Sequence, residues 1–296
     1  MELNMGHKSG FVNITGNPNV GKSTLMNALV GERISIITSK AQTTRHRILG
    51  IVNGADFQIV YSDTPGVLKP NYKLQNAMLN FSKSALADAD VLIYVTDIFD
   101  SPTKNADFVE QVKQNAAPII LVINKIDLTT QEKLIELVEK WETLLPKAEI
   151  FPISAQERFG IDNLLKRILQ LLPESPPYFD KEQLTDKPAR FFVTEIIREK
   201  ILLNYDREIP YSVEVEVEQF IEKENIININ AIIYVERNSQ KGIIIGHGGK
   251  MLKKVGKEAR IDIEAFFEKK VFIELYVKVE KDWRNRESKL KSFGYE

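Results

Sequence analysis

The sequence predicts a two-domain α/β protein: a doubly wound, mostly parallel sheet followed by a smaller α+β domain. Over residues 1–172, short apolar runs alternate with longer amphipathic segments. Residues 173–188 are rich in proline and lack apolar periodicity, which is typical of a linker. Within residues 189–296, the segments Ser212–Phe220 and Val271–Val279 alternate apolar with mostly polar or charged residues, as in strands with one buried face. The 296 residues suffice for two domains with separate cores.

The composition narrows the class of protein. Hydrophobic residues make up 43% and charged residues 27% of the chain, and the net charge is −1, so attraction to nucleic acid or membrane must be local. There is no cysteine, which excludes disulfides, thiolate metal sites and cysteine nucleophiles. The start lacks an apolar run of signal-peptide length, and no window reaches the length of a transmembrane helix. We expect a cytoplasmic protein.

The predicted strands of the first domain are apolar runs that each end in a polar turn before a helix-like segment. They are Phe11–Thr15, Phe57–Ser62, Val91–Thr96, Ile119–Ile123 and Ile150–Ile153. Two of the intervening segments, Thr24–Val30 and Glu132–Leu145, have helical character. Strands that alternate with helices predict a largely parallel sheet with helices on both faces.

The octapeptide GNPNVGKS at residues 16–23 fits the pattern of a phosphate-binding loop between a strand and a helix. Gly16 and Gly21 let backbone N–H groups close around phosphate oxygens, and the following helix N-terminus adds positive potential. Lys22 would reach the β- and γ-phosphates, and Ser23 would supply a hydroxyl to Mg²⁺. The sequence therefore predicts a P-loop nucleotide site.

Further nucleotide motifs follow later strands. DTPG at residues 63–66 places Asp63 where a carboxylate can hold magnesium through water, and the Gly66 N–H where it can meet the γ-phosphate. NKID at 124–127 and the pair Ser154 and Ala155 follow the next two strands. The Asp127 carboxylate can accept two hydrogen bonds from guanine, which adenine cannot offer. These residues favour GTP and GDP over ATP.

In order and rough spacing, GNPNVGKS, TTR, DTPG, NKID and SA resemble the translation-factor-related GTPases over the whole first domain. The resemblance implies that Thr44 closes on Mg²⁺ and the γ-phosphate, with Thr43 a weaker candidate. It implies that Lys125 packs beside the base and that the Ala155 N–H meets guanine O6. It makes Lys22, Thr44 and Gly66 the catalytic candidates. The remaining predicted nucleotide contacts are Asn17, Asn19, Val20, Thr24, Thr64, Asn124 and Ser154.

Two positions bear on the rate of hydrolysis. Val67 follows DTPG, where Ras-like enzymes carry a glutamine that orients the attacking water, so slow intrinsic hydrolysis is expected. Asn19 stands where related potassium-activated GTPases coordinate K⁺, an ion that could neutralise charge in the transition state. An asparagine in this loop could equally stabilise the turn.

The second domain is predicted as helix, strand, strand, helix, helix, strand. The helix Phe191–Asn204 precedes the strands Ser212–Phe220 and Ile229–Val235. In the first strand Val213, Val215 and Val217 alternate with glutamates, so the glutamates are expected on the exposed face. The last three elements are the helices Lys250–Arg260 and Ile261–Glu268 and the strand Val271–Val279.

A glycine-rich turn, Gly246-His247-Gly248-Gly249, precedes the first of these helices. Between residues 241 and 260 there are six basic residues and one acidic residue, which makes a local basic patch. A second nucleotide pocket is excluded because no Lys-Ser or Lys-Thr pair follows the glycines. This order of elements with a GxxG turn resembles the type II KH domain, whose turn lets an RNA backbone approach closely. The resemblance implies RNA contacts at Lys241, Ile244, Ile245, Gly246, His247, Gly248, Gly249, Lys250, Lys253, Lys254 and Lys257.

A GTPase domain joined to a C-terminal type II KH domain resembles the Era family of GTPases along nearly the whole chain. That resemblance implies a monomeric factor that binds the 3′ end of 16S ribosomal RNA and assists maturation of the 30S ribosomal subunit. It also implies peripheral contact with the inner face of the cell membrane. The alternatives are a tRNA-modification-type GTPase, which normally has a large N-terminal domain and a cysteine near its C-terminus, or a KH binding module with a structural GTPase domain.

Overall fold

The computed structural model describes residues 6–295 of the chain. It has two compact units, each with a core of its own. The first comprises residues up to 71 together with 75–186, and the second comprises 72–74 together with the residues from 187 on. Within residues 6–295, no helix combines the length and the apolar character needed to cross a membrane.

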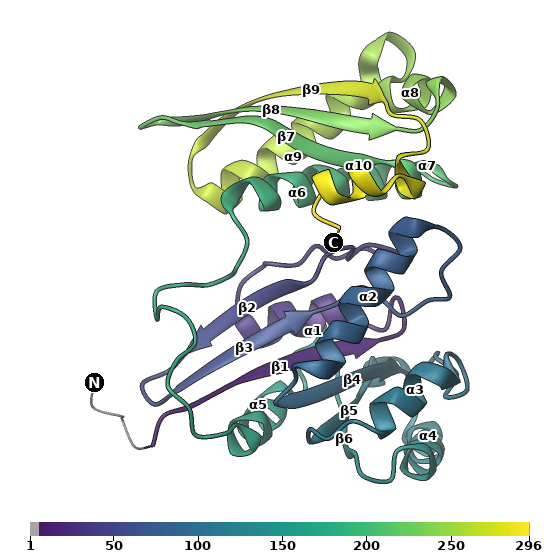
Figure 1. The fold of residues 1–296 in the computed structure, drawn as a ribbon, viewed down its shortest axis with the longest axis vertical. Helices are drawn as coiled ribbons and strands as arrows, with labels where there is room; N and C mark the ends of the chain where they lie inside the picture. The colour runs from purple at the N-terminus through teal and green to yellow at the C-terminus, as the bar shows by residue number, and fades with distance from the viewer. Residues whose placement is uncertain (1–5, 296) are drawn as a thin grey trace. The chain divides into compact units, whose positions relative to one another are not determined.

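The first unit contains a six-stranded sheet in the order β2-β3-β1-β4-β5-β6 (Figure 1). Five strands are parallel, and β2 is antiparallel to β3. The mostly parallel sheet predicted from the sequence is confirmed. The strands are β1 (Lys8–Gly16), β2 (Ile48–Asn53), β3 (Phe57–Asp63), β4 (Val91–Asp97), β5 (Ile119–Asn124) and β6 (Glu149–Pro152).

Helices cover both faces of this sheet (Figure 1). On one face, a buried cluster joins Leu86, Val112 and Trp141 from three helices to Tyr94 and Leu121 from the central strands. The strands fold this way because both of their faces are apolar, as expected when helices pack on both sides. The helices are α1 (Lys22–Val30), α2 (Lys73–Ala87), α3 (Ala106–Lys113), α4 (Gln131–Leu144) and α5 (Ile161–Leu171).

The edge strand β2 was not predicted from the sequence. It pairs with β3 through a short turn at Gly54, whose N–H donates to the Phe57 carbonyl at 2.9 Å. Ile48 and Ile51 face the core, whereas Val52 is only half-buried. The Asn53-Gly54 pair is a hairpin signal that could have revealed the strand.

The proline-rich segment 173–188 is held along the strands of the first unit. Gln58 is fully buried in β3, and its Oε1 accepts hydrogen bonds from the N–H groups of Tyr178 and Phe179 at 2.7 and 2.9 Å. Its Nε2 donates to the Phe179 carbonyl at 2.9 Å. Farther along, the Ile51 N–H donates to the Leu184 carbonyl at 2.8 Å. The segment up to residue 186 therefore belongs to the first unit.

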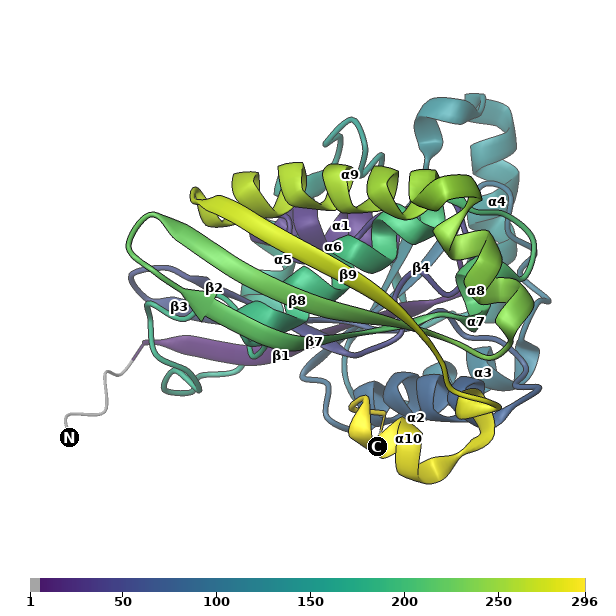
Figure 2. The same cartoon turned by 90° about the horizontal axis from the view of Figure 1, so that it is seen from above.

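The second unit has a three-stranded sheet in the order β7-β8-β9, with helices α6 and α9 along one face (Figure 2). β7 and β8 are antiparallel, and β8 and β9 are parallel. The α+β domain predicted from the sequence is confirmed. Its elements are α6 (Ala189–Asn204), α7 (Ile209–Ser212), β7 (Glu214–Glu222), β8 (Ile226–Val235), α8 (Asn238–Ile245), α9 (Lys250–Phe267), β9 (Lys270–Val279) and α10 (Glu287–Ser292).

Two sequence predictions in this unit are wrong in detail, and one helix was not assigned from the sequence. The two helices predicted over 250–268 are one helix, α9, because no breaker separates them. The apolar run before the glycines lies in the helix α8. Glu214 is buried at 2% exposure instead of facing solvent, since its carboxylate accepts a hydrogen bond from the Tyr295 hydroxyl at 2.7 Å. A buried carboxylate needs such a partner.

Candidate nucleotide and RNA sites

The loop between β1 and α1 requires glycine at both ends. Gly16 and Gly21 have φ of 146° and 96°, a region that side chains rarely adopt. A Cβ at Gly16 would lie 2.1 Å from the Val95 carbonyl oxygen, and one at Gly21 would lie 2.1 Å from Asn124 Nδ2. The Gly16 carbonyl accepts a hydrogen bond from the Val67 N–H at 3.0 Å, which ties this loop to the segment after β3. The sequence motif is thus a tightly packed turn.

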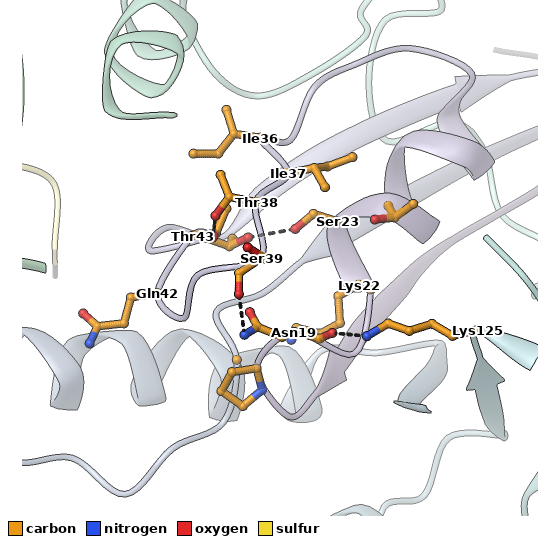
Figure 3. Close-up of a pocket in the computed structure, with 15 residues that line it drawn as sticks. Asn19, Lys22, Ser23, Ile36, Ile37, Thr38, Ser39, Gln42, Thr43 and Lys125 are labelled. Atoms are coloured by element: carbon orange, nitrogen blue, oxygen red, sulfur yellow. Dashed lines mark hydrogen bonds between the residues drawn. The ribbon is translucent and has the colours of Figure 1, made fainter. Parts of the chain in front are cut away.

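A cavity of about 430 Å³ opens beside this loop (Figure 3). One wall is the phosphate-binding loop with Lys22, Ser23 and Thr24, and another is the segment 36–44 that follows α1. Gly66 and Lys125 complete the lining. Residues from four of the predicted motifs therefore meet around one cavity.

Three oxygen-bearing side chains meet at the predicted magnesium position. The Ser23 hydroxyl donates to Asp63 Oδ2 at 2.7 Å and lies 2.8 Å from the Thr44 hydroxyl. The Thr44 hydroxyl donates to the same carboxylate oxygen at 3.4 Å. Asp63 is fully buried, and its Oδ1 has no hydrogen-bond partner. Burial raises the pKa of Asp63 despite these hydroxyl donors and Lys22, so a cation here would stabilise the carboxylate.

This donor set suits Mg²⁺, which prefers hard oxygen ligands and keeps several waters. Among residues 6–295 there is no cluster of three histidine or carboxylate side chains that could hold another metal. The buried Asp63 Oδ1, which has no hydrogen-bond partner, is the observation that fits a cation at this position.

Thr43 and Thr44 have different hydrogen-bond partners. The Thr43 hydroxyl lies 2.6 Å from the Thr38 hydroxyl and donates to the Lys40 carbonyl at 2.6 Å, so it stabilises its own loop. The Thr44 hydroxyl approaches Ser23 and Asp63. The geometry favours Thr44 as the magnesium ligand.

Lys22 is buried, and its Nζ donates to the Asn17 carbonyl at 2.8 Å. Burial lowers the pKa of Lys22 to about 8, against the opposing effect of the Asp63 and Asp100 carboxylates. A phosphate group in the cavity would favour the charged lysine. Asn19, at φ 65°, donates from its side chain to the Ser39 carbonyl at 2.9 Å, which links the phosphate loop to the segment 36–44.

Asn124 joins the motifs at the predicted base end. Its Nδ2 donates to the Val20 carbonyl at 2.9 Å, and its Oδ1 accepts from the Ala155 N–H at 2.9 Å. The Ala155 N–H was predicted to meet guanine O6, but here it is bonded to Asn124. Lys125 Nζ donates to the Asn19 carbonyl at 2.7 Å and to Asp97 at 2.5 Å.

The other predicted base contacts differ in exposure. Asp127 is exposed in a short 3-10 helix (Ile126–Leu128), where its carboxylate is accessible. Ser154 is buried, and its hydroxyl accepts from the Glu157 N–H at 3.2 Å, which stabilises the turn after β6. A ligand could therefore contact the Asp127 carboxylate directly. Ser154 would act indirectly, by stabilising the loop after β6.

Two predicted nucleotide contacts, Thr64 and Val20, have side chains that pack within the protein, and so does Val67. The Thr64 hydroxyl donates to the Ile14 carbonyl at 2.9 Å, and its side chain is fully buried. Val20 is 1% exposed. Val67, at 4%, packs into the core with Phe108, so it presents no group toward an attacking water.

In the second unit, the glycine turn is open to an approaching chain. Gly248 and Gly249 have φ of 59° and 75°, and a Cβ on either would meet no atom within 4 Å. At Gly246 a Cβ would lie 2.7 Å from the Met251 side chain. His247 is exposed, as are Lys250, Lys253, Lys254 and Lys257 on α9.

One predicted RNA contact is wrong. The Ile244 side chain is fully buried in the core of the unit, because α8 turns this side of its apolar run toward the sheet. Ile245 is half-buried and packs against the same core, and Lys241 is half-buried. Ile243, at 49% exposure, is the isoleucine of this run that faces solvent.

A groove of about 470 Å³ lies between α9 and β9, and of its lining residues only Lys253 and Lys257 were predicted as RNA contacts from the sequence. Its apolar floor is formed by Leu252, Gly256, Ile273 and Leu275, and Lys253, Lys257 and Arg260 lie on its lining. An isolated glycine inside a basic amphipathic helix costs stability, so it usually marks a packing or binding requirement. Gly256 was thus the available signal.

Comparison with known proteins agrees with this geometry. A family model described as "50S ribosome-binding GTPase" matches residues 11–125, and a KH domain model matches residues 208–284. The chain is 48% identical over 295 residues to GTPase Era of Alkaliphilus metalliredigens, covering 99% of this chain and all of that protein. It is 43% identical to GTPase Era of Ruminiclostridium cellulolyticum, with 98% of each covered. The chain belongs to the Era GTPase family.

A solved Era structure shares the whole fold. The structure of Era in complex with MgGDPNP and nucleotides 1506–1542 of 16S ribosomal RNA superposes with a TM-score of 0.93 and 38% sequence identity. It covers 98% of this chain and 99% of its own. A point variant of Era from Aquifex aeolicus, bound to GDP and AlF₄⁻, gives the same TM-score and identity. This Era family member is therefore a GTP hydrolase with a KH domain.

Proposed function

We propose that this Era family member is a GTP-switched RNA-binding protein that binds the 3′ end of 16S ribosomal RNA and assists maturation of the 30S subunit. The observation that supports it most strongly is the full-length similarity to an Era structure that holds both MgGDPNP and that RNA segment. This chain has two sites with matching chemistry. One unit has a cavity lined by the phosphate-binding loop, and the other has a basic groove near the glycine turn.

Within the nucleotide site, Lys22 and the loop N–H groups would bind the β- and γ-phosphates, and Ser23, Thr44 and Asp63 would hold Mg²⁺. The ion supplies positive charge where negative charge develops on the transferred phosphoryl group. The Gly66 N–H would hold the γ-phosphate, and the exposed Asp127 would select guanine. Because Val67 is turned into the core, no side chain at that position orients water, and slow intrinsic turnover is expected.

Potassium is the natural candidate for an additional activator. Asn19 lies exposed beside the cavity and bonds to the Ser39 carbonyl, so a cation at Asn19 would lie between the phosphate loop and the segment 36–44. We expect faster hydrolysis in KCl than in NaCl. Equal turnover in the two salts would rule out this role.

In the RNA site, the open Gly248 and Gly249 would admit a single-stranded backbone, and the apolar groove would hold unpaired bases. Lys253, Lys257 and Arg260 would neutralise phosphates. Mg²⁺ and GTP would order the segments around Thr44 and Gly66, and loss of the γ-phosphate would release them, which changes the affinity for RNA.

Filter binding of the full chain to an RNA of 16S nucleotides 1506–1542 tests this function. We expect at least tenfold tighter binding with a non-hydrolysable GTP analogue than with GDP. Gly248→Asp should lower RNA affinity about a hundredfold, because it adds a carboxylate where the backbone must pass, and should leave GTP turnover unchanged. Gly242→Asp is the matched control, since Gly242 in α8 also has open space around it. Equal RNA affinity in both nucleotide states would contradict the switch, and equal losses for the two variants would contradict the RNA site.

The place of action remains a prediction from the family resemblance: a monomer in the cytoplasm, with peripheral membrane contact.

A further inference from the structure

The loop between β4 and α3 is bonded to the phosphate-binding loop through the buried side chain of Asn17. Asn17, 1% exposed, donates from Nδ2 to Asp100 Oδ2 at 2.6 Å. Its Oδ1 accepts a hydrogen bond from Asn105 Nδ2 at 2.7 Å. Both bonds join residues more than eighty positions apart in the sequence. None of the nucleotide motifs includes Asp100 or Asn105.

Asn105 also reaches the segment that carries Gly66. Its Nδ2 donates to the Val67 carbonyl at 2.9 Å, while the Val67 N–H donates to the Gly16 carbonyl at 3.0 Å. One amide group therefore bridges the phosphate-binding loop and the residue directly after Gly66. Asn105 has φ 55°, a conformation that asparagine and glycine adopt more readily than other residues.

The bridge acts on both predicted γ-phosphate contacts. The Asn17 carbonyl accepts the hydrogen bond from Lys22 Nζ and so orients the lysine. Asn17 is itself held by Asp100 and Asn105. Gly66 is in close contact with the same loop, since a Cβ on it would lie 2.7 Å from Pro18 Cα. A shift of Asn105 would thus move the Gly66 N–H relative to Lys22.

We propose that Asn105, with Asp100 supporting it through Asn17, is a positioning residue that holds the Gly66 segment where its N–H can receive the γ-phosphate. This inference rests on the contact between Gly66 and the γ-phosphate in the proposed function. Hydrogen bonds to the buried Asn17 side chain fix its geometry strongly, because breaking one leaves a desolvated amide group without that partner. The bridge therefore supports discrimination between GTP and GDP, because the Gly66 N–H meets only the γ-phosphate, whereas Lys22 also meets the β-phosphate that GDP shares.

The test measures the affinity of the full chain for GDP and for a non-hydrolysable GTP analogue, together with single-turnover GTP hydrolysis. Asn105→Gly removes the bridging amide while tolerating the positive φ, so the fold is retained. We expect about a tenfold fall in affinity for the analogue and in the hydrolysis rate, with a much smaller fall in GDP affinity. Asp100→Ala should act in the same direction. Asp100→Asn keeps an acceptor for Asn17 and should restore the GTP preference.

Asn115→Gly is the matched control, because Asn115 Nδ2 makes a comparable bond to the Leu86 carbonyl at 2.6 Å, outside the nucleotide site. It should leave the ratio of the two affinities unchanged. Gly66→Ala, in the same assays, tests the Gly66 contact itself. If Gly66→Ala lowers the GTP preference and Asn105→Gly does not, the inference is wrong and the proposed function stands. If Gly66→Ala has no effect, the proposed γ-phosphate contact fails. Equal weakening of both nucleotides by Asn105→Gly would mean a purely structural bridge.

Discussion

At the level of single residues, the adjacent Thr43 and Thr44 have different roles. Thr43 contacts its own loop, and Thr44 lies at the proposed magnesium position. Thr44→Ala removes the hydroxyl near Ser23 and Asp63, so we expect single-turnover GTP hydrolysis to fall about a hundredfold at saturating Mg²⁺. GDP affinity should change less than twofold. Thr43→Ala removes the hydroxyl that contacts Thr38 and Lys40, so it should reduce hydrolysis far less. Equal losses from the two variants would show that the whole segment, and not Thr44, sets the rate.

Residue types and spacing predicted the phosphate site well, because its chemistry depends on backbone glycines and a few obligatory side chains. Ser23, Thr44 and Asp63 come from three separate segments, and the structure brings their oxygens together. Burial was harder to predict. Ile244 lies in an apolar run that offers no periodicity to show which member faces the core, and Asp100 and Asn105 belong to no motif.

At the level of elements, Gln58 attaches the proline-rich segment to β3. Replacing it with alanine leaves the Tyr178 and Phe179 backbone groups without their buried partner. We expect Gln58→Ala to cost about 3 kcal/mol in the free energy of unfolding of the first unit. Urea unfolding and the rate of tryptic cleavage after Lys181 measure this, and cleavage should accelerate. The control is Gln114→Ala, whose exposed bond to Glu110 should contribute little. Unchanged cleavage in Gln58→Ala would contradict the attachment.

Helix α9 makes a second prediction at this scale. Gly256 keeps the floor of the groove low, since a Cβ there would lie 3.4 Å from Leu275 Cδ1. Gly256→Leu should fill the groove and weaken RNA binding at least tenfold, because it blocks base contacts. Gly256→Ala should retain most of the RNA affinity and stabilise the helix by about 1 kcal/mol. Filter binding measures the RNA affinity of both variants, and thermal unfolding measures their stability. Full RNA affinity in Gly256→Leu would place the bases elsewhere.

Helices and strands were predictable where the spacing of apolar residues and the length of the segment indicated the same type of element. The central strands β4 and β5 are continuous apolar runs and were found, as was the alternation in β9. β2 was missed because only three residues separate it from its hairpin partner β3, and the turn signal at Asn53-Gly54 was not used. α8 was missed because its three isoleucines follow a glycine and lack helical periodicity.

For the whole molecule, the two tryptophans of the chain provide one probe in each unit. Trp141 is buried against Tyr94 in the first unit, and Trp283 is buried in the second, where its Nε1 donates to the Ser212 carbonyl at 3.0 Å. Each unit has its own core, and units of this kind commonly unfold as separate cooperative transitions. Fluorescence of Trp283→Phe then reports the first unit, and that of Trp141→Phe reports the second.

GDP with Mg²⁺ at about a hundred times its dissociation constant should stabilise the first unit by about 2.7 kcal/mol, because only the folded unit forms the phosphate cavity. In Trp283→Phe we therefore expect a rise of about 5–10 °C in the melting temperature. The transition of Trp141→Phe should not move with GDP, but should rise when the 16S RNA segment is added. Lys22→Ala in the Trp283→Phe background should abolish the effect of GDP. If GDP raises both melting temperatures equally, the two units unfold as one. Nucleotide binding would then stabilise the RNA-binding unit as well, even without the γ-phosphate.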